Sequence, residues 1–484
     1  MLKFVDVDRE TPEKREAQAR RDDFDEIYRD YATEKAAEQS ARCSQCGVPF
    51  CQSHCPLHNN IPDWLKATAE GRLEEAYEIS QATNTFPEIC GRICPQDRLC
   101  EGNCVIEQSG HGTVTIGAIE KYITDTAWEK GWVKPVKPRK ERGESIGIIG
   151  AGPGGMAAAD ALRRKGLQVT IYDRYDRAGG LLTYGIPGFK LEKDVVMRRV
   201  QQQQESGITF ELNCNIGTDI AFADLRAKHD ALLIATGVYK TREIGGPGSG
   251  YPGIVQALDY LTASNRKSFG DTVEGFETGT LDADGKNVVV IGGGDTAMDC
   301  VRTAVRQGAK AVTCLYRRDR VNMPGSMREV ANAEEEGVVF GWLSAPKAFE
   351  GGENGVTGVR AIGMRLGNPG PDGRRAPEEI DGSDTIIEAD LVIKALGFEP
   401  EELPGLWDQP ELEVTSWGTV KADFRTKQTA MPGVFAAGDI VRGASLVVWA
   451  IRDGREAADA ILAYLDGEAV AAPSDPGTFT VAAE

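Results

Sequence analysis

Eight of the eleven cysteines lie within the first 104 residues, where they form two short runs. Thiolates from short, turn-rich segments are the usual ligands of [4Fe–4S] clusters. Pro56 and Pro95 each directly follow a cysteine, as prolines do after cluster ligands. The pattern predicts two [4Fe–4S] clusters and therefore a protein that handles electrons. The predicted ligands are Cys43, Cys46, Cys51 and Cys55 in the first run, and Cys90, Cys94, Cys100 and Cys104 in the second.

Two other uses of the cysteines compete with iron–sulfur clusters. Structural zinc is usually held by paired C-x2-C knuckles, but only Cys43 and Cys46 have that spacing, so a zinc-stapled interaction domain is the weaker alternative. Disulfides need an oxidising compartment, and the N-terminus shows no apolar signal core, so we expect a cytoplasmic protein with reduced thiols. Cys214, Cys300 and Cys314 lie apart from the two runs among apolar residues, and we expect them to be unreactive.

The composition limits the possible partners. The 484 residues correspond to roughly three domains at about 150 residues each. A net charge of −19 disfavours nucleic acid and anionic membrane surfaces as partners. No stretch approaches the roughly 20 apolar residues that cross a bilayer. We therefore expect globular domains that bind neither nucleic acid nor membrane.

The N-terminal third has helical patterning and ends in a linker. Residues 1–40 are highly charged, and their spacing predicts a solvent-facing helix that is either a solvated lead-in or an arm that docks a partner. Residues 134–143 are rich in proline and charge, which predicts a linker and a domain boundary near residue 140. Helical periodicity within this domain covers residues 61–69, 73–83 and 116–129.

A dinucleotide-binding fingerprint follows the linker. A short apolar strand over 145–149 runs into a G-x-G-x-x-G loop formed by Gly150, Gly152 and Gly155, and an alanine-rich helix follows. These glycines allow a tight turn, close approach of the backbone to a pyrophosphate, and close packing of helix on strand. The next strand ends at Asp173, where a carboxylate can accept hydrogen bonds from a ribose.

A second fingerprint follows the strand over 287–291. Here the next strand ends in Arg317 and Arg318 instead of an acid, and arginine binds a 2′-phosphate that a carboxylate would repel. The second site is therefore predicted to prefer NADP(H), although the two arginines could merely cover the strand end. The predicted NADPH residues are Gly292, Gly294, Asp295, Thr296, Ala297, Arg317 and Arg318.

Two nucleotide folds in one chain suggest two nucleotides, and a flavin with a nicotinamide forms a hydride donor and acceptor pair. Near the C-terminus a strand and turn end in Gly438 and Asp439, and a helix follows over 445–461. Asp439 could hold a ribityl hydroxyl, and the helix N-terminus could favour negative charge on a reduced flavin. We therefore predict an α/β fold of two Rossmann-like domains, one inserted in the other, after an N-terminal α-helical iron–sulfur domain. The predicted bounds are 1–140 for the cluster domain, 141–283 and 410–484 for the FAD-binding domain, and 284–409 for the NADPH-binding domain.

The order of these motifs resembles the small (β) subunit of bacterial NADPH-dependent glutamate synthase over essentially the whole chain. The same module resembles the N-terminal half of dihydropyrimidine dehydrogenase and the large subunit of an electron-bifurcating NADH-dependent ferredoxin:NADP oxidoreductase. The resemblance implies that the first fingerprint binds FAD, that the second binds NADPH, and that residues 179–187 line the isoalloxazine ring. The implied FAD residues are Gly150, Gly152, Gly155, Asp173, Gly180, Leu181, Thr236, Gly237, Gly438, Asp439 and Val447.

Relatives of this module also imply how the cysteines are shared between clusters. In them the two runs interleave, which would give Cys55, Cys94, Cys100 and Cys104 to one cluster and the first three cysteines to the other. The fourth ligand of the latter cluster would be Cys90, with Glu120 as an alternative oxygen ligand. An oxygen ligand would alter the charge and potential of that cluster.

The resemblance implies hydride transfer from NADPH to FAD and single-electron relay through the clusters to a large (α) subunit. In the family, that subunit hydrolyses glutamine and reduces 2-iminoglutarate to glutamate at an FMN. A glutaminase of this class needs an N-terminal cysteine, but this sequence begins with Met1 and has no cysteine before Cys43, so we expect it to supply electrons only. The alternatives are the same module in a pyrimidine-reducing or ferredoxin-linked complex, a stand-alone NADPH diaphorase, and a flavoprotein with a zinc-stapled interaction domain.

Overall fold

The computed structural model describes residues 1–370 and 375–467, which divide into two compact units. Unit 1 contains Met1–Arg15, Asp25–Lys240 and Glu399–Gly467. Unit 2 contains Thr241–Phe398 together with the short N-terminal segment Glu16–Phe24. The cysteine-rich helices and the first fingerprint therefore belong to one unit, and the second fingerprint to the other.

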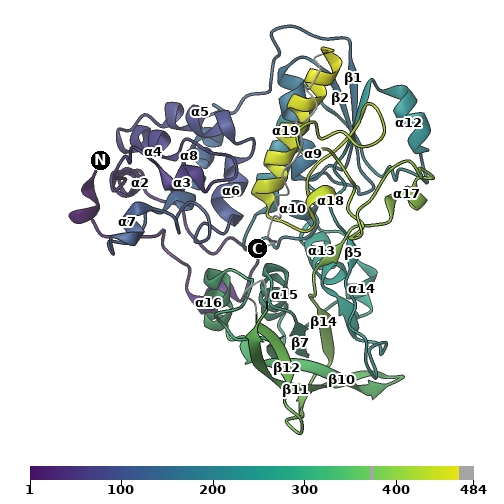
Figure 1. Cartoon of the computed structure of the whole chain (residues 1–484). Helices are drawn as coiled ribbons and strands as arrows, with labels where there is room; N and C mark the ends of the chain where they lie inside the picture. Colours follow the sequence, from purple (N-terminus) through teal and green to yellow (C-terminus); the bar gives the residue numbers. More distant parts are fainter. Residues whose placement is uncertain (371–374, 468–484) are drawn as a thin grey trace. The chain divides into compact units, whose positions relative to one another are not determined.

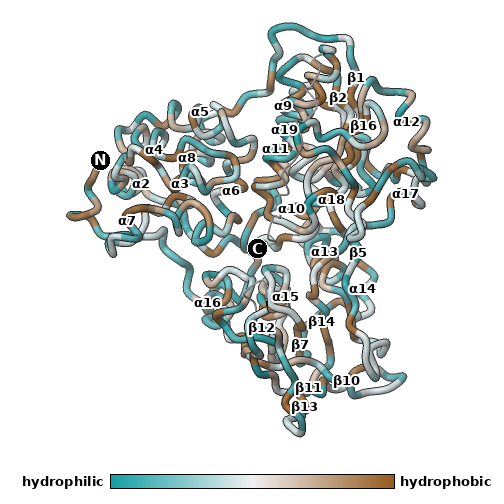
Figure 2. Tube along the Cα trace, viewed as in Figure 1, coloured by the Kyte–Doolittle hydropathy of each residue, from teal (hydrophilic) through white to brown (hydrophobic). Residues whose placement is uncertain are grey.

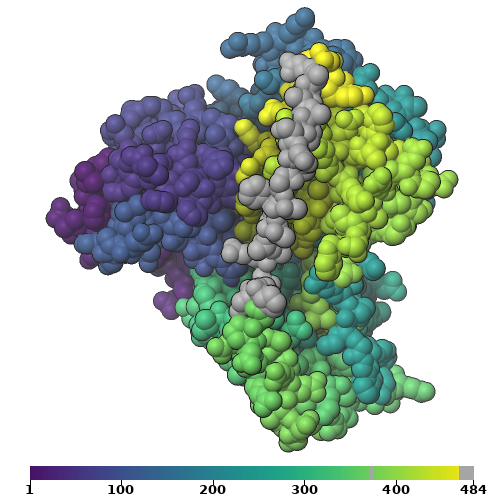
Figure 3. All heavy atoms as spheres, viewed as in Figure 1, coloured from purple at the N-terminus to yellow at the C-terminus, as the bar shows by residue number. Residues whose placement is uncertain are grey.

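The cysteine-rich part of unit 1 is a bundle of helices, purple and blue in Figure 1, that presents a continuous surface in Figure 3. Trp64 on one helix and Ile119 and Ile123 on another are fully buried, which is the expected inward stripe of amphipathic helices. The three helices predicted from periodicity are confirmed with the same bounds. The elements are η1 (Lys3–Val5), α2 (Thr33–Ser40), α3 (Phe50–Ser53), α4 (Ile61–Ala69), α5 (Leu73–Thr83), α6 (Pro87–Ile93), α7 (Val105–Gln108) and α8 (Ile116–Glu129).

The helix predicted to run through the charged N-terminal segment is mostly absent. Between α1 (Ala17–Arg20) and α2 the chain is irregular, and Lys14 pairs with Tyr28 in an antiparallel bridge. Tyr31 is buried, and its hydroxyl donates to the carbonyl of Glu10 at 2.6 Å. The helical prediction was wrong here because tertiary contacts of the aromatic side chains outweigh the local spacing.

The second half of unit 1 is a parallel sheet with helices on its faces. The strand order is β16-β4-β1-β2-β3, and every pairing is parallel. Helices α9 (Pro153–Arg164) and α19 (Val447–Leu465) pack together, and Figure 2 shows the strands brown and the outer loops mostly teal. The strands are β1 (Ser145–Ile149), β2 (Gln168–Tyr172), β3 (Thr209–Glu211), β4 (Ala231–Ile234) and β16 (Val434–Ala436).

Shorter elements complete unit 1. They are α10 (Leu181–Tyr184), α11 (Lys193–Glu205), α12 (Phe222–Lys228), α17 (Leu403–Leu406) and α18 (Asp439–Arg442). Strands β5 (Lys240–Thr241) and β15 (Phe398–Glu399), where the chain passes between the units, pair in a small sheet.

Unit 2 contains a second parallel sheet, with strand order β6-β14-β7-β8-β9. Strands β10 to β13 form a separate antiparallel sheet of this unit. Its helices are α13 (Ala257–Ser268), α14 (Glu274–Glu277), α15 (Asp295–Arg306) and α16 (Met327–Glu335). Its strands are β6 (Ile254–Gln256), β7 (Asn287–Ile291), β8 (Ala311–Tyr316), β9 (Val339–Trp342), β10 (Ser344–Gly352), β11 (Gly355–Pro369), β12 (Arg375–Glu379), β13 (Thr385–Glu388) and β14 (Leu391–Lys394).

The two parallel sheets and the N-terminal helices confirm the predicted fold class. The inserted unit begins at Thr241 and ends at Phe398, earlier at both ends than the predicted 284–409. The cause is β6, which pairs with β14 at the edge of the second sheet and so brings the segment before residue 284 into that unit. No helix within the described residues is both long and apolar enough to span a membrane.

A buried ion pair joins the cysteine-rich helices to the half of unit 1 that contains the parallel sheet. Arg199 on α11 donates to both carboxylate oxygens of Glu88 on α6, at 2.7 and 3.0 Å, and each side chain is at most 2% exposed. The guanidinium carbon also lies 5.0 Å from the ring centroid of Trp128. An unpaired charge left at this position would be strongly destabilising.

We expect Glu88→Gln to lower the free energy of unfolding by about 3–5 kcal/mol, because it leaves the Arg199 guanidinium buried without a counter-charge. The matched control is Glu413→Gln in the exposed pair with Lys421, which should change that energy by less than about 1 kcal/mol. Anaerobic denaturant titration of both variants measures the difference. Equal effects would contradict a structural role for the buried pair.

Candidate functional site

The first fingerprint loop has the backbone geometry of a phosphate cradle. Gly150 follows β1 with φ of +112°, and a Cβ there would lie 2.3 Å from the carbonyl oxygen of Ala235. A Cβ on Gly155 would lie 2.0 Å from the carbonyl oxygen of Gly150, so this glycine lets α9 approach the loop. Gly152 caps α9 and has open space where its side chain would be. The loop therefore fits a pyrophosphate at a helix N-terminus.

One cavity gathers most of the predicted flavin residues. Its wall includes the Thr236 hydroxyl, which is buried without a hydrogen-bond partner among the described residues. Gly155 and Gly180 are absent from the lining because they serve close packing, and a Cβ on Gly180 would lie 2.9 Å from the Cα of Gly152. The predicted residues that line the cavity are Gly150, Gly152, Asp173, Leu181, Thr236, Gly237, Gly438, Asp439 and Val447.

Asp173 has a structural task that the sequence pattern did not indicate. Its Oδ2 accepts the backbone N–H of Ala151 at 2.6 Å, and its Oδ1 accepts that of Tyr175 at 2.9 Å. Burial raises the pKa of this carboxyl, and the two backbone donors oppose that shift. Asp173 thus fixes the fingerprint loop while it lines the cavity, and its predicted bond to a ribose stays a prediction.

The C-terminal helix presents its N-terminus to the same cavity. Val447 is the first residue of α19 and lines the cavity beside Asp439. Burial raises the pKa of Asp439, whose Oδ1 accepts the Ser445 hydroxyl at 2.5 Å. The helix dipole places positive potential here, which suits an electron-rich group.

A buried lysine that sequence reasoning missed supports another part of the cavity wall. Lys193 on α11 is 9% exposed, and its ammonium donates to the carbonyl of Leu182 at 3.2 Å and to that of Ile186. Leu182 and Ile186 both line the cavity. Lys193 therefore holds the segment that was predicted to cover the isoalloxazine ring.

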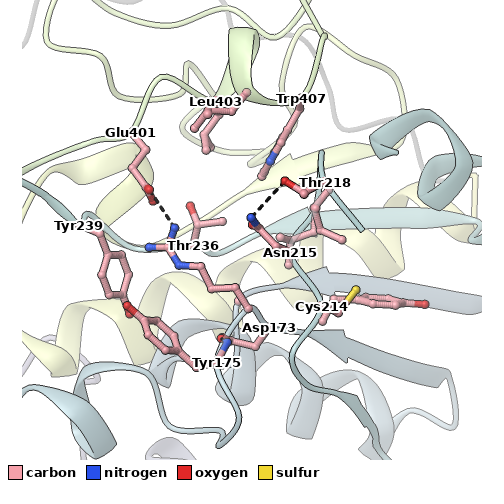
Figure 4. Close-up of a pocket in the computed structure, with 16 residues that line it drawn as sticks. Asp173, Tyr175, Cys214, Asn215, Thr218, Thr236, Tyr239, Glu401, Leu403 and Trp407 are labelled. Atoms are coloured by element: carbon pink, nitrogen blue, oxygen red, sulfur yellow. Dashed lines mark hydrogen bonds and ion pairs between the residues drawn. The ribbon is translucent and has the colours of Figure 1, made fainter. Parts of the chain in front are cut away.

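A second cavity continues from the first and was not foreseen from the sequence (Figure 4). The two cavities share Gly150, Asp173, Thr236 and Tyr239. Arg174 lies between an aromatic ring and an acid, with its guanidinium carbon 4.7 Å from the Tyr239 centroid and Nη1 2.8 Å from Glu401. Stacking surfaces beside a carboxylate suit a purine nucleoside. The other residues drawn there include Tyr175, Cys214, Asn215, Thr218, Leu403 and Trp407.

The second fingerprint repeats the first in unit 2. Gly292 has φ of +149°, and a Cβ there would lie 2.2 Å from the carbonyl oxygen of Ala395. Gly294 caps α15 and has open space where a side chain would be. Asp295 accepts the backbone N–H of Ser326 at 2.9 Å, and Ala297 is buried in the core. The loop fits a dinucleotide phosphate in the same way as the first.

Arg317 and Arg318 follow β8 at the sheet edge where β7 ends in the fingerprint, because β7 and β8 pair in parallel. Arg317 is exposed, whereas Arg318 is partly buried and its Nε lies 3.4 Å from the carbonyl oxygen of Arg375. Thr296 lies in the first turn of α15. The predicted NADPH residues therefore gather at one edge of the second sheet.

The eight N-terminal cysteines surround two cavities in the cluster helices. One is lined by Cys43, Cys46, Cys51 and Cys104, and the other by Cys55, Cys90, Cys94 and Cys100. No three His, Cys, Asp or Glu side chains within residues 1–370 and 375–467 are grouped as ligands of a single ion. Each set of four thiols lines one cavity, which fits the ligands of a multinuclear cluster.

The grouping differs from the expected one at two cysteines, because Cys104 and Cys90 take each other's places. Cys90 and its alternative Glu120 were expected beside Cys43, Cys46 and Cys51, but they line the cavity of Cys55, Cys94 and Cys100. Cys104 lines the cavity of the first three cysteines instead of that of Cys55, Cys94 and Cys100. Cys104 caps α7, and Ile106 of this helix lines the same cavity. Cys55 lies beyond α3 and lines the other cavity. The fold thus exchanges one cysteine between the runs.

Glu120 lines the second cysteine cavity together with Cys90. Its Oε1 accepts the side-chain amides of Asn59 and Asn84, each at 3.2 Å. Burial raises the pKa of Glu120 to about 8 and raises that of Cys100 well above its usual value. Five candidate ligands therefore face this cavity.

The flavin cavity and the two cysteine cavities of unit 1 lie in series. Val447 lines the flavin cavity, and the next residue, Val448, lines the cavity of Cys55, Cys90, Cys94 and Cys100. Ile116 lines both cysteine cavities. Each cavity is thus linked to the next by a shared lining residue or by neighbouring residues of one helix.

These features define an oxidoreductase with two dinucleotide folds and an iron–sulfur domain. A family model described as pyridine nucleotide-disulphide oxidoreductase matches residues 144–454, and one described as dihydropyrimidine dehydrogenase domain II, 4Fe-4S cluster, matches residues 20–132. The glutamate synthase [NADPH] small chain of Azospirillum brasilense is 66% identical over 97% of this chain and 98% of its own. The chain belongs to the family of these small chains.

Two further likenesses extend the comparison. The putative oxidoreductase AegA of Escherichia coli K12 is 46% identical over 95% of this chain but only 70% of its own length. The structure of Mycobacterium tuberculosis FprA in complex with NADPH matches with a TM-score of 0.57 and 20% identity, over 69% of this chain and 88% of that one. The likeness to FprA shows a common fold.

We expect Gly152→Val to fold normally but to lose most bound flavin, because its side chain would enter the open space above α9. Gly155→Val is the contrasting variant, since its Cβ would meet the carbonyl oxygen of Gly150 at 2.0 Å and should disrupt the fold. The flavin-to-protein ratio and the thermal midpoint of each variant test this. Full flavin occupancy in Gly152→Val would contradict the cradle.

Proposed function

We propose that this chain is the electron-input subunit of a glutamate synthase, which oxidises NADPH and delivers electrons to a large (α) subunit that forms L-glutamate from L-glutamine and 2-oxoglutarate. The observation that carries this proposal is the series of three cavities in unit 1, from the flavin fingerprint to the two cysteine cavities. The partner is inferred from the name of the relatives, which are small chains.

The cofactors proposed for these sites are FAD, NADPH and two [4Fe–4S] clusters. When bound, NADPH supplies a hydride, FAD accepts it and releases electrons singly, and the clusters relay them. The protein residues need not act as an acid or base. Their work is to hold nucleotides at the N-termini of α9 and α15, to support the flavin wall through Lys193, and to place positive potential at Val447.

For the clusters, we propose one ligand set for each cysteine cavity. Cys90 is the proposed fourth ligand beside Cys55, Cys94 and Cys100, because thiolate is the commoner ligand, with Glu120 as the alternative. Both line the cavity, so either can complete the set. The other set comprises Cys43, Cys46, Cys51 and Cys104.

A different electron acceptor is the second candidate. It is favoured by the iron–sulfur family description, which names dihydropyrimidine dehydrogenase, and by AegA, in which the similar region is only part of a longer chain. Mixing the purified chain with a glutamate synthase large subunit distinguishes the two candidate functions. Glutamate formation driven by NADPH supports the first candidate, and its absence with an active large subunit supports the second.

We expect Arg317→Ala combined with Arg318→Ala to raise the KM for NADPH by about 10- to 100-fold, because charge-assisted bonds to the 2′-phosphate contribute about 1.5–3 kcal/mol. The KM for NADH should change little. Arg365→Ala, which removes an exposed arginine of β11, is the control. Steady-state kinetics with both nucleotides make the comparison, and equal changes would exclude the assignment.

We expect the chain to contain about eight irons and Cys104→Ser about four, since one [4Fe–4S] set loses a ligand. Flavin bleaching by NADPH should persist, because the flavin cavity adjoins the other cysteine cavity through Val447 and Val448. Electron delivery to the large subunit should be lost. Iron analysis and anaerobic spectra test this, with Cys300→Ala as a thiol control outside both cavities. Zinc in place of iron would refute the electron path.

A further inference from the structure

One of the two cysteine cavities has a wall that is also part of the protein surface. It is the outer cavity, which Cys104 lines and which comes last in the series that begins at the flavin cavity. Phe50 and Val105 line the outer cavity, although they are 45% and 37% exposed. In Figure 1, α7, which Cys104 caps, lies on the far side of the cysteine-rich helices from α19. An electron that reaches the outer cavity can therefore leave the chain through this wall.

The exposed large apolar side chains of residues 1–140 all belong to three segments that adjoin the outer cavity. Two of these segments line it, and the third is attached where the backbone N–H of Leu2 donates to the carbonyl of Cys43 at 3.0 Å. Exposed apolar side chains that gather on one face mark an interaction site more often than scattered ones do. We name this set the apolar rim, and its members are Leu2, Val5, Val48, Phe50 and Val105.

Charge is depleted around the outer cavity. Residues 43–62 and 108–119 contain no Asp, Glu, Lys or Arg, although these residue types make up 27% of the chain and give it a net charge of −19. No charged side chain among the described residues lines the outer cavity. The core of a stable protein interface is depleted of charge in the same way, whereas a mobile partner is steered to its site by charge.

We propose that the apolar rim is the face on which the large (α) subunit docks as a permanent partner. The proposal rests on the proposed function, in which electrons leave this chain for that subunit. The occupant is a stable subunit and not a mobile electron carrier, because a face without charge cannot steer a carrier and its apolar side chains are stabilised by permanent burial. The large subunit would cover Phe50 and Val105 and so bring its own electron acceptor close to the outer cavity.

The test compares Val48→Glu with Trp417→Glu, which adds the same charge at an exposed apolar residue of unit 1 outside the cysteine-rich helices. Val48 is 67% exposed and does not line the outer cavity. Val48→Glu should raise the dissociation constant for the purified large subunit by about 10- to 100-fold, because docking would bury a carboxylate without a partner. Anaerobic sedimentation measures this constant, and Trp417→Glu should bind as wild type does.

Measurements on the wild-type complex keep the proposal testable if Val48→Glu misfolds, which a loss of iron or of NADPH oxidation with an artificial acceptor would reveal. Binding of the large subunit should slow deuterium exchange at the amides of residues 44–50 and 105–111. The dissociation constant should change by less than about threefold between about 0.1 and about 1 M salt, because salt screens charges and not apolar contacts.

Equal binding by wild type and Val48→Glu would overturn the proposal. A steep loss of affinity in salt would also overturn it, since that indicates a contact steered by charge. Dimers of the isolated chain that Val48→Glu dissociates would make a second copy the occupant of the apolar rim, again against the proposal. A wild-type complex that forms no glutamate would overturn the proposed function instead, and the comparison of binding constants would still decide where the large subunit docks.

Discussion

The close contact between α9 and α19 is the constraint on which the arrangement of unit 1 depends. A Cβ on Gly454 would lie 2.1 Å from the carbonyl oxygen of Gly154, so the two helices touch through their backbones. This contact fixes α19 along its length, and its first turn then lies where Val447 faces the flavin cavity and Val448 faces a cysteine cavity. One helix that returns after the inserted unit thus joins the nucleotide fold to the cluster helices.

Buried charges also hold the two halves of unit 1 together. Cavities in series depend on helices that keep their positions, because small shifts between the helices would alter the walls that the cavities share. The bidentate pair of Arg199 and Glu88 has a directional geometry that resists such shifts. Lys193 fixes the flavin wall from the same helix, α11, so one element secures both the nucleotide side and the cluster side.

The sequence predicted those features that depend on local backbone geometry. The strands β1, β2, β7 and β8 and both glycine loops were found because a strand, a tight turn and a helix leave a local pattern. The cavity around Arg174, Tyr239 and Glu401 was missed because its walls come from segments far apart in the chain. The allocation of Cys90 and Cys104, which rested on the resemblance, also differs, because spacing gives the ligands but the packing of the helices decides which cavity each one faces.

The segment Glu16–Phe24 shows why charge patterning alone could not distinguish a solvated helix from a segment that packs through a buried charge. The segment has the composition of exposed chain, and most of its charges are exposed, but one arginine among them is buried. What distinguishes Arg20 from Arg21 is the presence of two acids at the end of α16, more than 300 residues later in the sequence. A buried charge is stable only with its partner, so its place is set by acids that are distant in the sequence and not by its neighbours in the chain.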